Sequence, residues 1–451
     1  MYSCNYFVTV KIVVLLKIAH SERFVNLYIL LLQINCIVFI HFLLEFICFP
    51  LYFLYNQKII QEFIMKKVKF GIVGIGNMGS SHAVSISKMD NAILTAVCDI
   101  EPAAFERLSA ETRKNIGCYT DVDKFLADAD IDVVVVAVPH YDHPEIAIKA
   151  MKHNKHVIVE KPITVHKKMA LELLAESEKH PELVRALMLN QRTIPAHIKI
   201  KQLIDSGELG KITRVNWIIT DWFRTQSYYD SGDWRASWRG EGGGVLLNQC
   251  PHQLDLMQWF FGMPTKVRAT AKFGKYHDIE VEDEVNAYLE YADGKVGNFI
   301  ASTGEMPGTN RLEITADRGR VVFEHGKLEF IRNEVPTSVH IKTCKQGFKK
   351  SDIWLCDIKL SGDSEYQHLK ILKNVADVIL NGGELISPLA DGIRGLELGN
   401  AMLLSGLKDK TVELPLDAEE YAAELEKLIA TSRYTKKVTK IKNHDDFKNS
   451  F

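Results

Sequence analysis

Short apolar runs alternate with helix-length amphipathic segments in the chain after residue 65. These runs are too short and too rich in β-branched residues to prefer a helix; they are Val68 to Val73, Leu94 to Cys98, Ile131 to Val138 and His156 to Val159. Continuous hydrophobicity of this kind is typical of parallel strands that are buried on both faces. The segments between them predict helices at Ser80 to Met89, Ala103 to Lys114, Asp123 to Ala129 and Glu145 to His153. Repeated strand–helix units with short links predict a doubly wound parallel α/β sheet.

The pattern changes after about residue 185 to an alternation of apolar and polar positions, which is typical of antiparallel strands with one covered face. The alternating segments are Ile212 to Thr220, Thr265 to Phe273, Glu284 to Tyr291, Lys295 to Ser302, Arg311 to Ala316 and Arg318 to Glu324. We expect them to form one large, open, mostly antiparallel sheet. Helices are predicted at Pro195 to Ser206, Tyr366 to Leu380 and Gly392 to Ser405. The expected domains are 65–187 and 188–430, followed by a polar tail at 431–451 that frays.

Residues 1–64 differ from the rest of the chain in being rich in Ile, Leu, Phe and Tyr. Between Asn26 and Tyr55 the only ionisable side chains other than Tyr and Cys are His41 and Glu45. A stretch of this length can span a bilayer, which takes about 20 residues, so a membrane anchor is one interpretation. A signal peptide fits badly, because the apolar part is too long and no small-residue cleavage site follows. The interpretation we favour is translated upstream sequence before a natural start at Met65.

Composition narrows the class of protein. The chain of 451 residues has 55 Lys and Arg against 57 Asp and Glu, so no basic excess indicates nucleic acid as a partner. Its eight cysteines show neither a C-x-x-C pair nor a zinc spacing. We expect reduced thiols, no metal site and a cytoplasmic enzyme, with a membrane partner only if residues 1–64 are genuine.

A glycine motif follows the first predicted strand and opens the first predicted helix. It reads Gly74-x-Gly76-x-x-Gly79, with Asn77 and Met78 at the helix start. In a dinucleotide site the first glycine makes a tight turn and the second lets the backbone approach the pyrophosphate. The third lets the helix pack close to the strand, and the helix N-terminus points at the phosphates. Glycine triplets also occur in ordinary loops, so the motif needs its strand–helix context.

An acidic residue supports that context and selects the cofactor. Asp99 ends the second predicted strand, twenty residues after Gly79, where a carboxylate is expected to accept hydrogen bonds from the ribose hydroxyls. No Arg or Lys lies between Cys98 and Phe105 to neutralise a 2′-phosphate. We therefore predict NAD rather than NADP.

Polar residues also follow the third and fourth predicted strands. One strand ends at Pro139 to His143 and the next at Glu160-Lys161-Pro162. Ligands of doubly wound sheets bind outside the carboxyl ends of the strands. We therefore add Pro139, His143, Glu160 and Lys161 to the predicted cofactor contacts, although His143 can equally be a capping or loop residue.

These motifs occur together with a Gly242-Gly243-Gly244 run and with Asn248-x-x-x-His252-x-x-Asp255. In order and spacing they resemble the glucose–fructose oxidoreductase / inositol dehydrogenase (Gfo/Idh/MocA) family over about residues 66–430. The resemblance implies an NAD(P)-binding Rossmann domain and an α/β domain whose open sheet often forms oligomer contacts, hence a homodimer or homotetramer. It implies hydride transfer at a secondary hydroxyl of a sugar, inositol or glycoside. By the same resemblance Lys161 is the active-site lysine and His252 the catalytic histidine.

One position departs from the family pattern. Many of the family's dehydrogenases have Asp four residues before the histidine, whereas this chain has Asn248. An amide can orient a hydroxyl but cannot accept a proton or raise the pKa of the histidine by charge. Either lysine and histidine alone suffice for proton transfer, or Asn248 only positions substrate.

Oxidation of a secondary alcohol needs a base for the hydroxyl proton. His252 is the candidate, because an unperturbed pKa of about 6.5 suits reversible transfer near neutrality. Asp255, one helical turn further, would orient the imidazole; the alternative is a buried His252 that is simply bonded to Asp255. Lys161 would hydrogen-bond the substrate oxygen and stabilise developing negative charge.

Aromatic residues and arginines crowd the segment that precedes the glycine run. Trp234 and Arg235 are predicted substrate contacts, because aromatic rings stack on sugar faces and Arg donors reach hydroxyls or a carboxylate; core or interface packing is the alternative. Arg192 is a further substrate candidate, with Asn248 and His252. Two other functions stay open: an enzyme that retains and recycles NAD internally, for example in glycoside 3-oxidation, and a non-catalytic NAD-binding regulator.

Overall fold

The computed structural model describes residues 67–360, 362 and 365–438. The apolar segment 1–64, with its anchor and upstream-sequence interpretations, lies outside the described residues. Within the described part of the chain, no helix is long and apolar enough to cross a membrane. Residues from Lys67 onward form one compact unit, so the domain boundary near residue 187 stays a prediction.

Six parallel strands form the first sheet, of which the apolar runs predict four; β3 and β6 were not predicted. They are β1 (Val68–Val73), β2 (Ala92–Cys98), β3 (Gly117–Tyr119), β4 (Val133–Val136), β5 (His156–Val159) and β6 (Arg185–Leu187). Their order is β3-β2-β1-β4-β5-β6, so the direction of strand addition reverses between β1 and β4. At such a reversal, crossover helices diverge to opposite faces and leave a crevice for ligand. The doubly wound sheet is confirmed.

Helices cover both faces of this sheet: α4 (Asn77–Ile86), α5 (Ala110–Lys114), α6 (Val122–Asp128), α7 (His143–Lys152) and α8 (Lys167–Ser177). The single helix expected at 103–114 is wrong. It is divided into a 3₁₀ helix, η2 (Pro102–Arg107), and α5, because the Ser109 hydroxyl caps a new start by accepting from the Thr112 amide at 3.0 Å.

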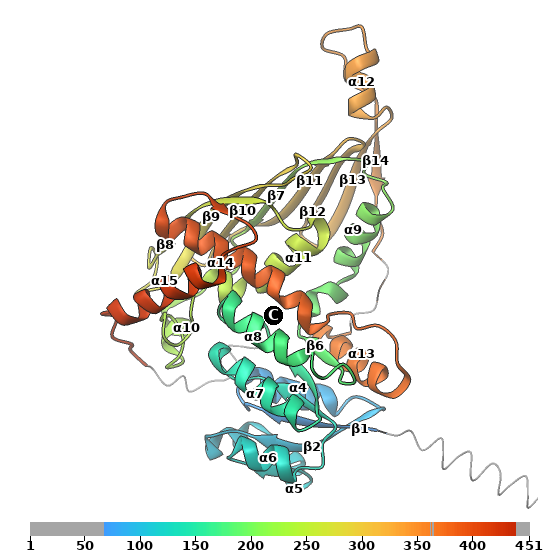
Figure 1. Ribbon diagram of the computed structural model, residues 1–451. Helices are drawn as coiled ribbons and strands as arrows, with labels where there is room; N and C mark the ends of the chain where they lie inside the picture. Colours follow the sequence, from blue (N-terminus) through green and yellow to red (C-terminus); the bar gives the residue numbers. More distant parts are fainter. Residues whose placement is uncertain (1–66, 361, 363–364, 439–451) are drawn as a thin grey trace, which may run out of the picture. The chain divides into compact units, whose positions relative to one another are not determined.

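The second sheet has nine strands in the order β14-β13-β12-β11-β7-β10-β9-β8-β15. Only the β7–β10 pair is parallel, so the expectation of a large, mostly antiparallel sheet is confirmed. In Figure 1, α9 (Pro195–Asp205), α11 (Pro251–Phe261) and α14 (Gly392–Lys408) lie along the same face of this sheet. The strands are β7 (Ile212–Ile219), β8 (Lys266–Phe273), β9 (Glu282–Glu290), β10 (Val296–Ser302), β11 (Asn310–Ala316), β12 (Gly319–Glu324), β13 (Lys327–Asn333), β14 (Ile353–Asp357) and β15 (Val412–Glu413).

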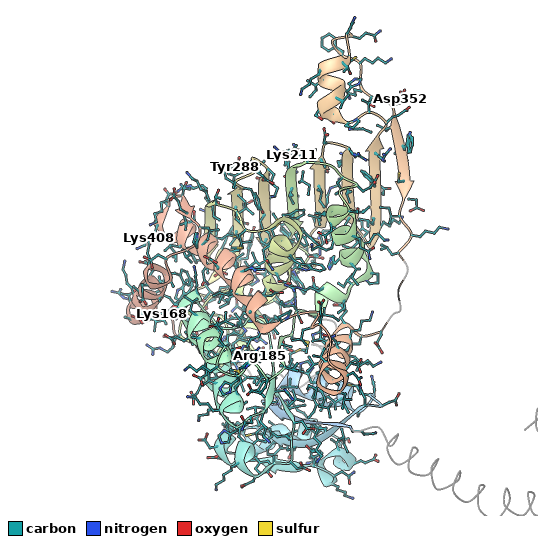
Figure 2. All side chains as sticks on the ribbon, turned by 45° about the vertical axis from the view of Figure 1, so that its right-hand side comes forward. Lys168, Arg185, Lys211, Tyr288, Asp352 and Lys408 are labelled. Atoms are coloured by element: carbon teal, nitrogen blue, oxygen red, sulfur yellow. The ribbon has the colours of Figure 1, made fainter. Side chains whose placement is uncertain are left out.

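Three regions depart from the predicted pattern. Strands β13 and β14 flank a segment that carries α12 (Thr337–Thr343) and projects beyond the sheet (Figure 1); Figure 2 labels Asp352 where β14 begins. Helix α13 (Gln367–Asn381), expected within the second domain, packs instead against α4 and β1, where Leu372 and Val375 are fully buried. Helix α15 (Ala418–Thr431) was not predicted.

The described part of the tail, residues 432–438, is held by hydrogen bonds, and the expectation that it frays is wrong there. Ser432 Oγ donates to Glu280 Oε2 at 2.5 Å, and Tyr434 Oη donates to the Asp278 carbonyl at 3.0 Å. Lys436 Nζ donates to the Tyr229 carbonyl. Local polarity suggested a frayed end, but the partners that hold the tail are some 150 to 200 residues away in sequence.

Candidate active site

The glycine loop between β1 and α4 has the geometry that a dinucleotide site requires. Gly74 has a φ of +91°, and a Cβ there would lie 2.5 Å from the Ala137 carbonyl oxygen. A Cβ on Gly79 would lie 1.8 Å from the Gly74 carbonyl oxygen, so helix and loop touch. A Cβ on Gly76 would meet nothing within 4 Å. The two outer glycines are thus required by packing, whereas the middle one faces open space where a pyrophosphate can approach.

Asn77 and Met78 begin α4, and no side chain caps this helix start. Its first amides are therefore available to an anion. At the end of β2, Asp99 Oδ2 accepts from the Ile75 amide at 2.6 Å and Oδ1 accepts from the Glu101 amide at 2.9 Å. The carboxylate is thereby held beside the loop. Arg107 in η2 also reaches the loop and donates to the Ile75 carbonyl at 3.1 Å. The sequence did not reveal this contact, because the two residues are 32 positions apart.

The ends of β4 and β5 are tied together by His143. Its Nδ1 lies 2.8 Å from the Pro162 carbonyl oxygen and its Nε2 lies 2.9 Å from that of Val138. Burial, only partly offset by these carbonyls, lowers its pKa. His143 thus has its ring nitrogens engaged by backbone, at the start of α7, while Pro139 precedes the short helix η3 (His140–Asp142).

A buried hydrogen-bonded pair lies under the end of β5. Glu160 Oε1 is 2.6 Å from His82 Nε2, and Oε2 accepts from the Lys161 amide at 3.1 Å. Burial alone would raise the pKa of Glu160. The hydrogen bond and the charge of His82 outweigh this effect, and the pKa of Glu160 is lowered to about 2. His82 was missed in the sequence, although its position on α4, three residues after Gly79, points it at the sheet.

Lys161 joins the first sheet to the helical layer of the second. Its Nζ donates to the Asn248 carbonyl at 2.9 Å. Burial is the largest cause that lowers its pKa, to about 8; the positive charges of Arg235 and Arg224 act in the same direction, against Glu160 and Glu241. An amine with this pKa is partly neutral near physiological pH and can accept a proton.

His252 lies at the start of α11 and is 6% exposed. Its Nδ1 is buried without a hydrogen-bond partner in the described residues. Burial, followed by the charges of Lys161 and His368, holds its pKa well below the usual range. The ring is therefore neutral, and an available nitrogen is a natural contact for a substrate hydroxyl.

Asp255 does not orient His252, contrary to expectation. Its carboxylate accepts from Arg192 Nε at 2.8 Å and Nη2 at 2.6 Å, and from Gln258 at 2.9 Å. The Arg192 Nη1 donates to Asp391 at 2.7 Å. Both side chains are buried. Arg192 was predicted to contact substrate. In the structure its guanidinium instead links α11 to the start of α14 through two carboxylates.

Asn248 lies in a π-helical turn, η5 (Val245–Gln249). The turn is held by Glu282, whose carboxylate accepts from the Gly244 amide at 2.8 Å and the Leu246 amide at 3.0 Å. Asn248 Nδ2 donates to Glu241 Oε1, and Glu241 Oε2 accepts from the Ala236 amide at 2.7 Å. Burial raises the pKa of Glu241.

Glu241 was missed, although it stands directly before the Gly242-Gly243-Gly244 run. It supplies a carboxylate next to the residue whose amide replaces the family's common aspartate. A carboxyl group is therefore hydrogen-bonded to the side chain at position 248, and its charge raises the pKa of Lys161.

Trp234 and Arg235 lie next to this hydrogen-bond network. The Arg235 guanidinium lies 4.4 Å from the ring centroids of both Trp234 and Tyr228, and Nη1 donates to Tyr228 Oη at 2.7 Å. Trp234 meets His140 edge-on, with ring centroids 5.1 Å apart. The structure thus brings Lys161, Asn248, His252 and the Trp234–Arg235 pair to one region. Among the residues it describes, no group of three His, Cys, Asp or Glu can hold a metal ion.

Fold and site together define an NAD-binding oxidoreductase. Residues 68–187 match the profile of the oxidoreductase family with an NAD-binding Rossmann fold, and residues 197–322 match the GFO/IDH/MocA C-terminal domain. The chain belongs to the Gfo/Idh/MocA family of oxidoreductases, with NAD as the cofactor of its Rossmann domain.

Characterised proteins resemble the chain over most of its length. It is 24% identical over 396 residues to levoglucosan dehydrogenase from Pseudarthrobacter phenanthrenivorans, which covers 78% of this chain and 99% of the relative. It is 26% identical over 354 residues to inositol 2-dehydrogenase from Rhizobium meliloti, covering 77% and 99%. A solved structure of the WlbA dehydrogenase from Chromobacterium violaceum, in complex with NADH and UDP-GlcNAcA, superposes with a TM-score of 0.67 at 25% identity, covering 78% and 97%.

Proposed function

We propose that this protein is an NAD-dependent dehydrogenase that transfers hydride between a secondary hydroxyl of a sugar, inositol or glycoside and the nicotinamide. The observation that carries the proposal is the position of Lys161. It follows β5 at the carboxyl edge of the Rossmann sheet, and its amine bonds the turn that leads into His252. The similar proteins named inositol 2-dehydrogenase and levoglucosan dehydrogenase support this substrate class.

In this proposal Lys161 is the proton acceptor. NAD, held by the glycine loop and Asp99, would take up the hydride of the carbinol carbon. The neutral Nζ of Lys161 accepts the hydroxyl proton, so that the alcohol becomes a ketone and the amine becomes an ammonium group. A pKa of about 8 makes Lys161 a better base near neutrality than His252, whose pKa is well below its usual range. This reverses the roles expected from the sequence: His252 then orients the substrate oxygen through its ring nitrogen.

Asn248 is proposed as a positioning residue. Its backbone carbonyl holds Lys161 Nζ and its side-chain amide is bonded to Glu241, so it locates the amine without itself exchanging a proton. Gly74, Gly76, Asn77, Met78, Gly79, Asp99 and Glu160 are proposed to line the NAD site, with Pro139 and His143 shaping the β4 end.

The test is absorbance of reduced nicotinamide with the full chain, and in parallel with the chain from Met65, given NAD and a panel of sugars, inositols and glycosides. Turnover that disappears in Lys161→Met and His252→Ala would support the assignment. If nothing turns over but denaturation releases NAD, the internally recycling enzyme replaces it. If neither signal is seen and a Lys161→Met strain keeps its phenotype, a non-catalytic regulator is favoured.

We also propose that the protein is cytoplasmic and forms a homodimer or homotetramer through the second sheet. The face of that sheet opposite α9, α11 and α14 carries the exposed Tyr288 on β9, labelled in Figure 2. Light scattering behind size-exclusion chromatography measures the state directly; a monomer at micromolar concentration would contradict it.

A further inference from the structure

We infer that the substrate carries an anionic group, a carboxylate or a phosphate, which Arg224 and Arg235 hold next to the reacting hydroxyl. The inference rests on the proposed dehydrogenase function and makes its substrate class narrower. It is carried by two guanidinium groups that share one aromatic support and form no ion pair with an acid in the described part of the chain.

Tyr228 is the shared support. The Arg224 and Arg235 guanidinium carbons lie 4.9 and 4.4 Å from the centroid of its ring. Each also stacks on a tryptophan, Arg224 on Trp222 at 5.3 Å and Arg235 on Trp234 at 4.4 Å. A guanidinium that is stacked on rings keeps its N–H groups directed outward along its edge, the arrangement that binds a carboxylate or phosphate through two parallel hydrogen bonds.

Neither guanidinium forms an ion pair with an acid among the described residues, although the charge of Arg235 acts on Glu241 and that of Arg224 on Asp221. Arg224 donates through Nη1 only to the carbonyl of its neighbour Phe223, at 3.0 Å, and its Nε is buried without a partner. Arg235 donates to Tyr228 Oη. The described residues form no ion pair with either arginine, whereas the buried Arg192 has two carboxylates. Leaving two half-buried cations unpaired is costly unless a ligand completes them.

Of the four acids near these arginines in sequence, three accept hydrogen bonds from other groups, and the fourth, Asp233, is exposed. Asp221 is hydrogen-bonded by Asn310, and Asp230 accepts from Gln226 at 3.0 Å. Both oxygens of Glu241 are occupied, by Asn248 and by the Ala236 amide. Asp221, Asp230 and Glu241 therefore have donors of their own, and within the described residues Asp233 forms no ion pair with either guanidinium.

This arginine pair is coupled to the reaction centre through covalent and hydrogen-bonded neighbours. Tyr228 Oη accepts from Gln249 Nε2 at 3.2 Å, and Gln249 follows Asn248, whose carbonyl holds Lys161. The charges of Arg235 and Arg224 lower the pKa of Lys161, after the larger effect of burial. An anion bound between them would offset the repulsion among three cations. The pyrophosphate of NAD has its own site at the glycine loop on β1 and α4.

The experiment compares matched sugars that differ at one carbon: glucose, glucuronate and glucose 6-phosphate, with the corresponding galactose series. NAD reduction is measured for the full-length protein and for Arg224→Met and Arg235→Met. Arg332→Met is the matched control, since Arg332 also stacks on a tryptophan, Trp354 at 4.8 Å, but is paired with Glu208 far along the second sheet. NADH binding, followed by nicotinamide fluorescence, checks that each variant is folded.

We expect an anionic sugar to exceed its neutral counterpart in kcat/KM. Each site variant should lower kcat/KM for the anionic sugar by roughly ten- to hundredfold, mainly through KM, and affect the neutral sugar little. A preference for glucuronate identifies a carboxylate, and a preference for glucose 6-phosphate a phosphate. Arg332→Met should match the unaltered protein.

Three outcomes would overturn the inference. In the first, the protein turns over neutral and anionic sugars with equal kcat/KM, and each site variant lowers kcat/KM for the two kinds of sugar equally. The proposed dehydrogenase function would not be contradicted by that result. Another is loss of NADH binding in the site variants, which would assign the arginines to the cofactor. If no sugar is turned over, thermal shift in the presence of NADH decides: stabilisation by the anions that requires both arginines supports the inference, and its absence refutes it.

Discussion

The two ends of the site are built in different ways. The cofactor end consists of one contiguous loop, Gly74 to Gly79, plus a single carboxylate at Asp99, and its critical contacts are made by backbone. The substrate end is assembled from residues of separate segments, which include Lys161, Tyr228, Glu241 and Asn248. Hydrogen bonds made by side chains join these segments. The first requires small residues at fixed spacing, and the second requires partners at distances that sequence spacing does not record.

This difference determines what substitutions should do. At the cofactor end, shape is decisive, because a methyl group either collides with backbone or faces open space. At the substrate end, charge is decisive, because Lys161 works within the combined field of Glu160, Glu241, Arg224 and Arg235.

The largest expected effect is that of Lys161→Met. Removing the amine removes the proposed proton acceptor, so kcat should fall by about a thousandfold. NADH affinity should change little, because the glycine loop is untouched. Stopped-flow turnover and nicotinamide fluorescence measure the two quantities. A variant that keeps more than a tenth of the activity would remove Lys161 from the chemistry and return the role of base to His252.

Glycine substitutions test the shape rule at the other end. In Gly79→Ala the new Cβ would lie 1.8 Å from the Gly74 carbonyl oxygen, which should cost about 3 kcal/mol of the free energy of unfolding. Gly76→Ala has no neighbour within 4 Å, so its unfolding midpoint in urea should match the unaltered protein while the Kd for NADH rises about tenfold. Equal destabilisation by both substitutions would contradict the distinction.

The same contrast explains how far the sequence could be interpreted. Both sheets, the glycine loop and the positions of Asp99 and Lys161 at strand ends were predictable, because strand periodicity, tight turns and strand ends are local properties of a sequence. Glu241, His82 and the role of Arg192 were not, since each depends on a partner between 7 and 199 residues away. Asp255 shows the limit clearly: its spacing from His252 suggested a hydrogen bond, but Arg192, 63 residues earlier, takes the carboxylate.

The pH profile sharpens the description of the substrate end. If neutral Lys161 is the base, kcat/KM should rise with pH and level off above about 8, the pKa of Lys161. Glu241 raises that pKa and Arg235 lowers it. The midpoint of the rise in kcat/KM should therefore move to lower pH in Glu241→Gln and to higher pH in Arg235→Met, each by up to about one pH unit. A midpoint below pH 6.5 that neither substitution moves would identify His252 as the base instead.

The smallest expected effect concerns the tail at residues 432–438, which holds the segment that carries Tyr228 and Arg235. Ser432 and Tyr434 bond residues 280 and 278, and Lys436 bonds the Tyr229 carbonyl. Ending the chain at Thr431 should loosen this segment and raise the KM for the sugar about three- to fivefold, with the Kd for NADH unchanged. Ending it at Val438 keeps these contacts and is the matched control. The described residues of the tail contact the substrate end. A truncation at Thr431 that weakened NADH binding and sugar binding alike would therefore show that the two ends are not as separately built as these contacts indicate.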